Sequence, residues 1–147
     1  MRDFIPIFEF AYQKHDGQLD KAGQPYILHP ITVALGCKEE SEKVVAYLHD
    51  VLEDTDATVD DLINLGLLQE EIDAIVLLTK PKGEEYSAYI ERVSKNRLAT
   101  VVKMSDLRHN MQIDRIPNPS EKDFKRIKKY RKAYEFLRAS LRKFEEK

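Results

Sequence analysis

Apolar residues recur in this chain at intervals of three and four along segments of ten residues or more, whereas alternation with a period of two is hard to find. Spacing of this kind gathers apolar side chains on one stripe of an α-helix, while a half-buried strand needs a period of two. We therefore predict an all-α fold. The predicted helices cover approximately residues 3–15, 30–36, 42–54, 58–66, 69–79, 86–95, 98–112 and 120–145.

Several helix ends carry recognisable signals. Pro30 suits the first position of a helix, because an N–H group there would have no partner. Ser41 and Ser120 suit the position before a helix, where a hydroxyl accepts a hydrogen bond from the backbone. Thr58 with Asp61 has the spacing of a capping box. These signals divide the chain into short helices joined by polar turns.

Two predicted helices differ in how they bury their apolar residues. The helix at 98–112 is apolar on several sides, so we expect it at the centre of the core. The last helix has a single apolar stripe, formed by Phe124, Ile127, Tyr130, Tyr134, Leu137 and Leu141. We expect this stripe to be buried and the other faces of the last helix to be exposed.

The composition is that of a globular protein, with 42% hydrophobic and 34% charged residues and no low-complexity tract. No apolar run reaches the roughly 20 residues of a membrane span. The first residues, "MRDFIPIFEF", lack the features of a signal peptide. A single cysteine, Cys37, cannot form an internal disulfide. We therefore expect one domain over residues 1–147, located in the cytoplasm and without a membrane partner.

Charge is distributed unevenly along the chain. Residues 121–147 contain eleven Lys or Arg and five Asp or Glu, whereas the preceding part contains thirteen and twenty-one. The basic C-terminal helix, about 120–145, can be a phosphate-attracting wall, a nucleic-acid patch or a solvated face, and the solvated face is the commonest of the three. Its apolar residues are interleaved with the charges, and no nucleic-acid-binding motif accompanies them. Nucleic acid is therefore not an expected partner. The acidic body needs a cation in order to bind a phosphorylated ligand.

The segment "YLHDVLEDT" places His49, Asp50, Glu53 and Asp54 within two turns of a predicted helix. His49 lies one turn from Glu53, and Asp50 lies one turn from Asp54, so the four side chains share one strip. Neighbouring carboxylates repel each other by a few tenths of a kcal/mol per pair even when they are exposed. Imidazole and carboxylate are suitable ligands for Mn, Fe or Zn, and a bound divalent metal compensates the repulsion.

A metal site needs further ligands, and two other segments of the chain can provide them. His29 is expected at the start of a helix, and Asp106 lies in an otherwise apolar helix, with Asn110 one turn further along the same face. An unpaired carboxylate in an apolar helix is costly. Taken singly, His29 can cap its helix, Asp106 can pair with a Lys or Arg, and the acids near Glu53 can form a solvated face. As a set, they favour a metal site.

Three motifs together resemble a known family. The stretch "HDVLEDT" resembles the signature of the metal-dependent HD phosphohydrolases. The motifs "HDGQLDKAGQPYILHP", "AYLHDVLEDT" and "VKMSDLRHNM" occur in the order, and at roughly the distances, seen in the alarmone hydrolase domain of Rel/Spo stringent-response proteins and their small stand-alone relatives. The resemblance covers about residues 8–111. It implies an HD-domain helical bundle, and it implies a hydrolase-only form because no second region matches a synthetase domain.

The resemblance also implies a role for each matching residue. The implied ligands of one metal ion, manganese in that family and Fe or Zn by the same ligand chemistry, are His29, His49, Asp50 and Asp106. Glu53 and Asp54 match the acidic pair assigned to catalysis, and Asn110 matches an asparagine that contacts the nucleotide sugar. Lys21, Lys103, Arg108 and the basic C-terminal helix are candidates for binding phosphates. The family reaction removes the 3′-pyrophosphate from guanosine tetra- or pentaphosphate, (p)ppGpp, and leaves GDP or GTP.

Two positions depart from the family's base-recognition pattern. Asp20 stands where the family usually has an arginine that packs on the guanine ring, and Ala22 stands where a serine is frequent. An aspartate cannot stack on a base as a planar cation does. An HD phosphatase for another phosphorylated nucleotide, such as NADPH or a dNTP, is therefore kept as an alternative. A regulatory module that binds a nucleotide without turnover is a third hypothesis, which the presence of both Glu53 and Asp54 disfavours.

Overall fold

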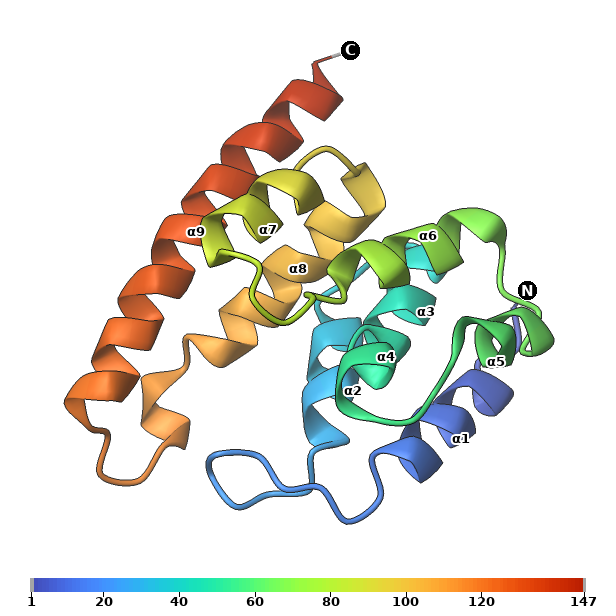
Figure 1. The fold of residues 1–147 in the computed structure, drawn as a ribbon, viewed down its shortest axis with the longest axis horizontal. Coiled ribbons are helices and arrows are strands. Elements are labelled where there is room, and N and C mark those ends of the chain that lie inside the picture. Colours follow the sequence, from blue (N-terminus) through green and yellow to red (C-terminus); the bar gives the residue numbers. More distant parts are fainter. Residues whose placement is uncertain (1, 147) are drawn as a thin grey trace.

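The computed structural model describes residues 2–146 (Figure 1). Within this range the chain forms nine α-helices and one short 3-10 helix, η1, and its only strand-like feature is an isolated bridge between Leu19 and Pro25. The helices are α1 (Ile5–Lys14), α2 (Leu28–Leu35), α3 (Glu40–Leu48), α4 (Val51–Asp54), α5 (Val59–Asn64), α6 (Gln69–Leu78), α7 (Tyr86–Val93), α8 (Arg97–Asn110), η1 (Ile113–Arg115) and α9 (Glu121–Glu145). The all-α prediction is confirmed. No helix in this range combines the length and the apolar character that crossing a membrane requires.

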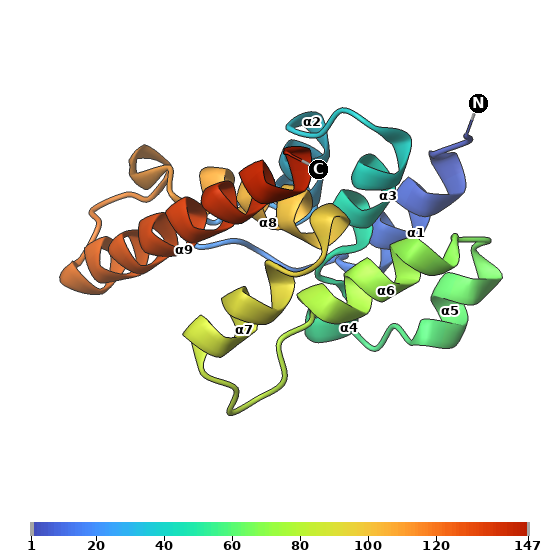
Figure 2. The same ribbon diagram turned by 90° about the horizontal axis from the view of Figure 1, so that it is seen from above.

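Helix α8 lies at the centre of the molecule, as predicted from its apolar residues. It packs against α2, α3 and α6 on one side and against α9 on the other, an arrangement that Figure 1 and Figure 2 both show. Leu107 of α8 belongs to the same buried core as Leu48 of α3 and Leu137 of α9. Cys37 also lies in this core, and burial raises the pKa of its thiol to about 11. We therefore interpret Cys37 as a packed core residue.

Helix α2 begins earlier than predicted. It starts at Leu28, so Pro30 occupies its third position and not its first. The first N–H groups of any α-helix have no intrahelical partner, and a proline is therefore tolerated throughout the first turn. The earlier start places His29 in that turn, within hydrogen-bond distance of Asp106 in α8.

The helix predicted at 42–54 is interrupted. Helix α3 ends at Leu48, and α4 is a separate single turn. The interruption falls at His49 and Asp50, whose backbone stays close to helical with φ of −61° and −105°. Apolar periodicity continues across the interruption, so it could not be predicted from spacing. Because of the interruption, the adjacent residues His49 and Asp50 are not part of a regular helix. They lie at the point where other helices converge.

The start of α3 also differs from the prediction. Glu39 is the N-cap, and its side chain forms a capping box with Glu42. Ser41, the predicted N-cap, lies in the first turn and donates its hydroxyl to Glu71 of α6 at 2.7 Å. Glu71 is fully buried and also accepts two hydrogen bonds from the guanidinium of Arg2, each of 2.7 Å. This tertiary network outweighs the local preference of a serine for the capping position.

The other predicted caps are confirmed. Thr58 forms a capping box with Asp61 before α5, and Ser120 caps α9. The predicted stripe of α9 is wrong at its beginning, because Leu137 is fully buried whereas Phe124 is 56% exposed. The first turns of α9 lie at the edge of the molecule (Figure 1), where that face is open to solvent.

Candidate active site

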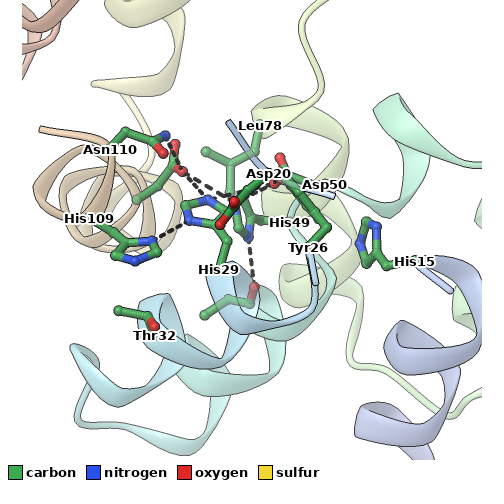
Figure 3. Close-up of polar contacts among 12 residues, drawn as sticks. His15, Asp20, Tyr26, His29, Thr32, His49, Asp50, Leu78, His109 and Asn110 are labelled. Atoms are coloured by element: carbon green, nitrogen blue, oxygen red, sulfur yellow. Dashed lines mark hydrogen bonds and ion pairs between the residues drawn. The ribbon is translucent and has the colours of Figure 1, made fainter. Parts of the chain in front are cut away.

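The four predicted metal ligands meet where α2, α3, α4 and α8 converge. His29 lies in the first turn of α2 and His49 directly follows α3. Asp50 precedes α4, and Asp106 lies within α8. Both histidines and Asp106 are buried, and Asp50 is half-buried. Figure 3 shows His29, His49 and Asp50 close together between the helices. We refer to these four side chains as the histidine–carboxylate cluster.

One ring nitrogen of His49 is fixed and the other has no partner. Its Nδ1 lies 2.7 Å from the carbonyl oxygen of Ala46, which can only accept, so Nδ1 carries the proton of a neutral ring. Its Nε2 is buried and makes no hydrogen bond within the described chain, although Asp50 Oδ2 and Asp106 Oδ1 lie 3.0 and 3.4 Å away. Burial lowers the pKa of His49, but Asp50 and Asp106 raise it well above its ordinary value, so a positive charge is favoured between Nε2 and the two carboxylates. A cation between these groups satisfies all three.

His29 is oriented by a second histidine. Its Nε2 lies 2.7 Å from Asp106 Oδ1 and 3.8 Å from Asp50 Oδ2. Its Nδ1 lies 2.7 Å from Nδ1 of His109, and the two rings are stacked with centroids 5.0 Å apart (Figure 3). Burial, followed by the proximity of His29 and Arg115, lowers the pKa of His109 to about 4. A neutral His109 accepts the hydrogen bond, so His29 directs Nε2 at the carboxylates.

The cluster concentrates negative charge in a buried place. Burial raises the pKa of the Asp106 carboxyl, but the ammonium of Lys103, 2.7 Å from Oδ2, and the neighbouring histidines lower it to well below its usual range. Burial also raises the pKa of Asp50, and the proximity of His49 reverses this effect and brings the pKa to about 2. The hydroxyl of Tyr26 donates a further hydrogen bond to Asp50. Both carboxylates are therefore ionised at neutral pH.

These donor atoms fit a divalent metal ion. Ligand atoms of His29, His49 and Asp50 all lie within 4.8 Å of one another, and Asp106 Oδ1 adjoins both imidazole rings. Two imidazole nitrogens with two carboxylates form a mixed donor set that suits Mn, Fe or Zn. The buried Nε2 of His49, which has no hydrogen-bond partner within residues 2–146, is the observation that most strongly favours a cation.

Two cavities open beside the cluster. The smaller has a volume of 210 Å³ and is lined by the cluster together with Glu53 and Asp54. The larger has a volume of 380 Å³ and is lined by the loop after α1, by residues around η1 and by α9. The residues common to both linings are Tyr26, His29, Asn110 and Tyr130. Because the linings overlap, one ligand can lie partly in each cavity.

Glu53 and Asp54 lie on the exposed side of the smaller cavity. The Oε1 atom of Glu53 accepts a hydrogen bond of 2.7 Å from the backbone N–H of Lys80, so the segment after α6 fixes this carboxylate. Burial against the site, with the charges of Asp50 and Glu53, raises the pKa of Asp54 to about 6. A carboxyl that changes protonation near neutral pH suits a group that exchanges a proton with water.

Asn110, Lys21 and Lys103 line these cavities as predicted, whereas Arg108, also predicted to bind phosphates, lines neither of them and contacts the hydroxyl of Tyr134. Asn110 lies where the two linings overlap, and its Nδ2 donates to Asp106 Oδ1 at 3.1 Å. Lys21 lines the larger cavity and is exposed. Lys103 lines the smaller cavity, where it pairs with Asp106 and lies 5.3 Å from the centre of the Tyr89 ring. Part of the charge of Lys103 is therefore compensated by the protein itself.

Asp20, which departs from the family pattern, is not an unpaired negative charge. Its Oδ2 lies 3.6 Å from Nη1 of Arg115, which follows α8 by a few residues and lines the same cavity. An arginine is thus present beside the position where the family usually has one, although it comes from a different part of the chain.

Two residues of the site were missed from the sequence. His109 orients His29, and the hydroxyl of Tyr26 bonds to Asp50. Helical spacing offered a weak signal for both, because His109 follows Asp106 by three residues and Tyr26 precedes His29 by three. Nothing in this spacing indicates which partner across the molecule each side chain contacts.

Comparison with known proteins gave several similar chains and no matching family model. The chain is 34% identical over 127 residues to a probable GTP pyrophosphokinase of Mycobacterium leprae, covering 78% of this chain and 16% of that protein. It is 33% identical over 116 residues to the guanosine-3′,5′-bis(diphosphate) 3′-pyrophosphohydrolase of Aquifex aeolicus, covering 71% of this chain and 17% of that protein. The chain therefore spans only a small part of the length of these relatives.

A solved structure shares the fold. It is described as a metazoan ortholog of SpoT that hydrolyzes ppGpp, and it matches with a TM-score of 0.77 at 22% identity, covering 95% of this chain and 92% of the other. At this identity the match concerns the fold alone. The sequence relatives and this structure confirm the resemblance that the three motifs predicted.

Proposed function

Because the chain resembles the hydrolase domain of Rel/Spo stringent-response proteins in sequence and in fold, we propose that it removes the 3′-pyrophosphate from guanosine tetra- or pentaphosphate. The products are pyrophosphate and GDP or GTP. The observation that carries this proposal is that the histidine–carboxylate cluster and two further carboxylates, Glu53 and Asp54, line one cavity. A phosphate hydrolase needs both a cation site and a group that accepts a proton from water.

The cluster would hold one divalent cation, for which we propose Mn²⁺, with Fe²⁺ or Zn²⁺ as alternatives of similar ligand chemistry. When bound, such a cation offsets phosphate charge and lowers the pKa of water beside it. The chain's own contribution is to fix the ligands. Ala46 and His109 set the tautomers of His49 and His29, while Lys103 and Asn110 hold Asp106.

Glu53 and Asp54 are proposed to move the protons of the reaction. Hydrolysis joins a water oxygen to the phosphorus that carries O3′ and breaks the O3′–P bond, so water loses a proton and O3′ gains one. Asp54 is ionised above a pH of about 6 and can accept the proton of water. Glu53 is held by the Lys80 N–H and can orient the same water through its other carboxylate oxygen.

The relatives carry two kinds of name, pyrophosphokinase and pyrophosphohydrolase. Each alignment covers 16% or 17% of the relative, so the names describe proteins much longer than the matched region. A proton acceptor does not distinguish the two activities, because a nucleotide hydroxyl also loses a proton when it accepts a pyrophosphate group. Hydrolysis is favoured because the solved structure described as hydrolysing ppGpp matches this chain over nearly the whole length of both. Another phosphorylated nucleotide, NADPH or a dNTP, is the alternative substrate of the same chemistry.

Product analysis on Mn²⁺-loaded protein tests the proposal. Guanosine tetraphosphate, NADPH and a panel of dNTPs are offered side by side, and pyrophosphate and GDP are expected from the first. Glu53→Gln should abolish most of the turnover while Mn²⁺ still binds, because Glu53 is exposed and is not part of the cluster. Glu135→Gln, on the exposed face of α9, is the matched control and should keep full activity.

Two results would contradict the proposal. Phosphate release from NADPH or a dNTP, with guanosine tetraphosphate untouched, would mean that the chemistry is right and the substrate wrong. Full turnover by Glu53→Gln would remove the proposed role of this carboxylate.

A further inference from the structure

The larger cavity is bordered by cationic side chains from three separate segments. Lys21 comes from the loop after α1, Arg115 from η1 and Arg126 from α9. Figure 1 shows the loop after α1 and the segment after α8 facing each other at the lower edge of the molecule. Among the described residues that line this cavity, Asp20 is the only acid. The lining therefore has an excess of positive charge, next to an acidic cluster.

Lys21 responds to this positive charge. Burial lowers the pKa of Lys21, and Arg126 lowers it further. A bound anion would relieve this repulsion, because it favours the charged form of the lysine.

Arg115 has one donor that the protein does not use. Its Nη1 lies 3.6 Å from Asp20 Oδ2, and its Nη2 donates to the carbonyl oxygen of His109 at 3.2 Å. Its Nε is buried and makes no hydrogen bond within residues 2–146. A buried N–H group without a partner is unfavourable, so the protein alone does not satisfy this guanidinium fully. The guanidinium itself is 28% exposed at the cavity.

Asp20 holds Arg115 from a fixed position. Its Oδ1 accepts hydrogen bonds from the backbone N–H groups of Ala22 and Gln24, each of 2.9 Å. These bonds fix the carboxylate within the turn and leave Oδ2 directed at Arg115. The aspartate therefore stabilises the loop and positions a cation at the same time.

We propose that Arg115, positioned by Asp20, binds the 5′-diphosphate of the nucleotide whose 3′-diphosphate lies at the histidine–carboxylate cluster, an inference that rests on the proposed function. The planar guanidinium presents paired N–H groups that match phosphate oxygens. Asn110 and Tyr130 line both cavities, so a nucleotide between them has one phosphorylated end on each side. A substrate phosphorylated at both ends fits this division of charge better than one phosphorylated at a single end.

Equilibrium binding of GDP and guanosine to metal-free protein tests the inference without turnover. In the presence of a chelator the acidic cluster repels phosphates, so the 5′-diphosphate of GDP reports on the larger cavity. Arg115→Gln should weaken GDP binding about tenfold or more and leave guanosine binding unchanged, because a hydrogen bond to a charged group is lost. The control Arg138→Gln, on the exposed face of α9, should change neither.

A double-mutant cycle tests the positioning role of Asp20. Asp20→Asn keeps an oxygen for the two backbone N–H groups but removes the charge that faces Arg115. It should weaken GDP binding by a smaller factor than Arg115→Gln, and this effect should vanish when Arg115 is already replaced. Equal effects of Asp20→Asn in both backgrounds would assign Asp20 to the loop alone and overturn its positioning role.

The outcomes separate this inference from the proposed function. Unchanged GDP binding by folded Arg115→Gln, or an equal loss of guanosine binding, overturns the phosphate role of Arg115. If the wild-type protein binds GDP through Arg115 but does not hydrolyse guanosine tetraphosphate, the proposed function fails and the inference about Arg115 stands. If both hold, Arg115→Gln should raise the KM for guanosine tetraphosphate and leave that for guanosine 3′-diphosphate unchanged.

Discussion

At the scale of single residues, the site depends on side chains that fix the proposed metal ligands as well as on those ligands themselves. His109 is the clearest case, because its Nδ1 lies 2.7 Å from His29 and its ring stacks on that ligand. A histidine that binds a metal through one nitrogen usually needs a partner at the other, and removing such a partner typically lowers metal affinity tenfold to a hundredfold.

We therefore predict that His109→Ala lowers Mn²⁺ affinity by about tenfold or more while the protein stays folded. Isothermal titration with Mn²⁺ measures this effect directly, and thermal unfolding of the metal-free variant checks the fold. Arg108→Gln is the matched control, because Arg108 is adjacent in α8 but is exposed and contacts Tyr134. Equal affinities for the wild type and His109→Ala would mean that His29 is oriented without His109.

Asp54 gives a prediction about pH. Its pKa in the folded protein is raised to about 6, mainly by burial, so folding favours the protonated form. The ionised carboxylate thus destabilises the metal-free protein above pH 6, and this penalty disappears below the ordinary pKa near 4. Asp54→Asn should stabilise the chain by about 1 kcal/mol at pH 7.5, a value reduced by solvent screening, and by little at pH 4.5.

Urea unfolding with a chelator present at the two pH values measures this difference. Asp56→Asn provides a control of opposite sign, since Lys14 lowers the pKa of Asp56 through an exposed ion pair. Removing that charge should slightly destabilise the protein at pH 7.5. A stabilisation by Asp54→Asn that is equal at both pH values would exclude the ionisation of Asp54 as its cause.

The residues of the site could be predicted to different degrees. His49 and Asp50 with the following acids were visible because they are close in sequence, and Asp106 was visible because a carboxylate is out of place in an apolar helix. The contact between His29 and His109 and the pair of Asp20 with Arg115 join residues far apart in the chain. Local spacing contains no information about such contacts.

At the scale of helices, periodicity located the elements well and their ends less well. The capping signals at Thr58 and Ser120 were sufficient because nothing else competes for these side chains. Ser41 was misassigned because it bonds to Glu71, and the interruption at His49 was missed because apolar spacing continues through it. For Ser41, a tertiary contact overrides a local preference.

Glu71 gives the prediction at this scale. It connects the N-terminal segment, α3 and α6 through hydrogen bonds from Arg2, Ser41 and the backbone of Leu68. Glu71→Ala leaves these donors without their partner and should lower the free energy of unfolding by about 3 kcal/mol in urea denaturation. The exposed pair of Glu135 with Arg138 is the control, and Glu135→Ala should cost less than about 0.5 kcal/mol. Similar losses of stability in both variants would mean that the burial of Glu71 does not determine its contribution to stability.

At the scale of the whole molecule, the uneven charge of the sequence becomes a spatial division. The acidic cluster lies among α2, α3, α4 and α8, and the basic helix α9 packs along α8 and contributes Arg126 and Tyr130 to the larger cavity. The basic helix therefore has a face that borders the site, in addition to the solvated face expected from the sequence. This packing depends on few buried residues of α9, chiefly Ala133 and Leu137.

We predict that Leu137→Ala lowers the free energy of unfolding by about 3 kcal/mol, because it leaves a cavity between α9 and the core. Phe136→Ala is the matched control, since Phe136 is the preceding residue and is 47% exposed, and it should change stability by less than about 0.5 kcal/mol. Urea denaturation of both variants gives the comparison. Equal effects of the two substitutions would mean that α9 is not held by the face assigned here.

The cluster is assembled from α2, α8 and the junction between α3 and α4, and this has a consequence for how the protein folds. His29 and Asp106 are separated by 77 residues, and each of the other two ligands adjoins a different helix end. No short fragment of the chain contains the site, so a nascent or partly refolded chain has no defined place for the ion until its long-range contacts form. If the cluster binds a metal ion as proposed, metal capture is a late event in folding, and misfolded copies of the chain lack the proposed activity.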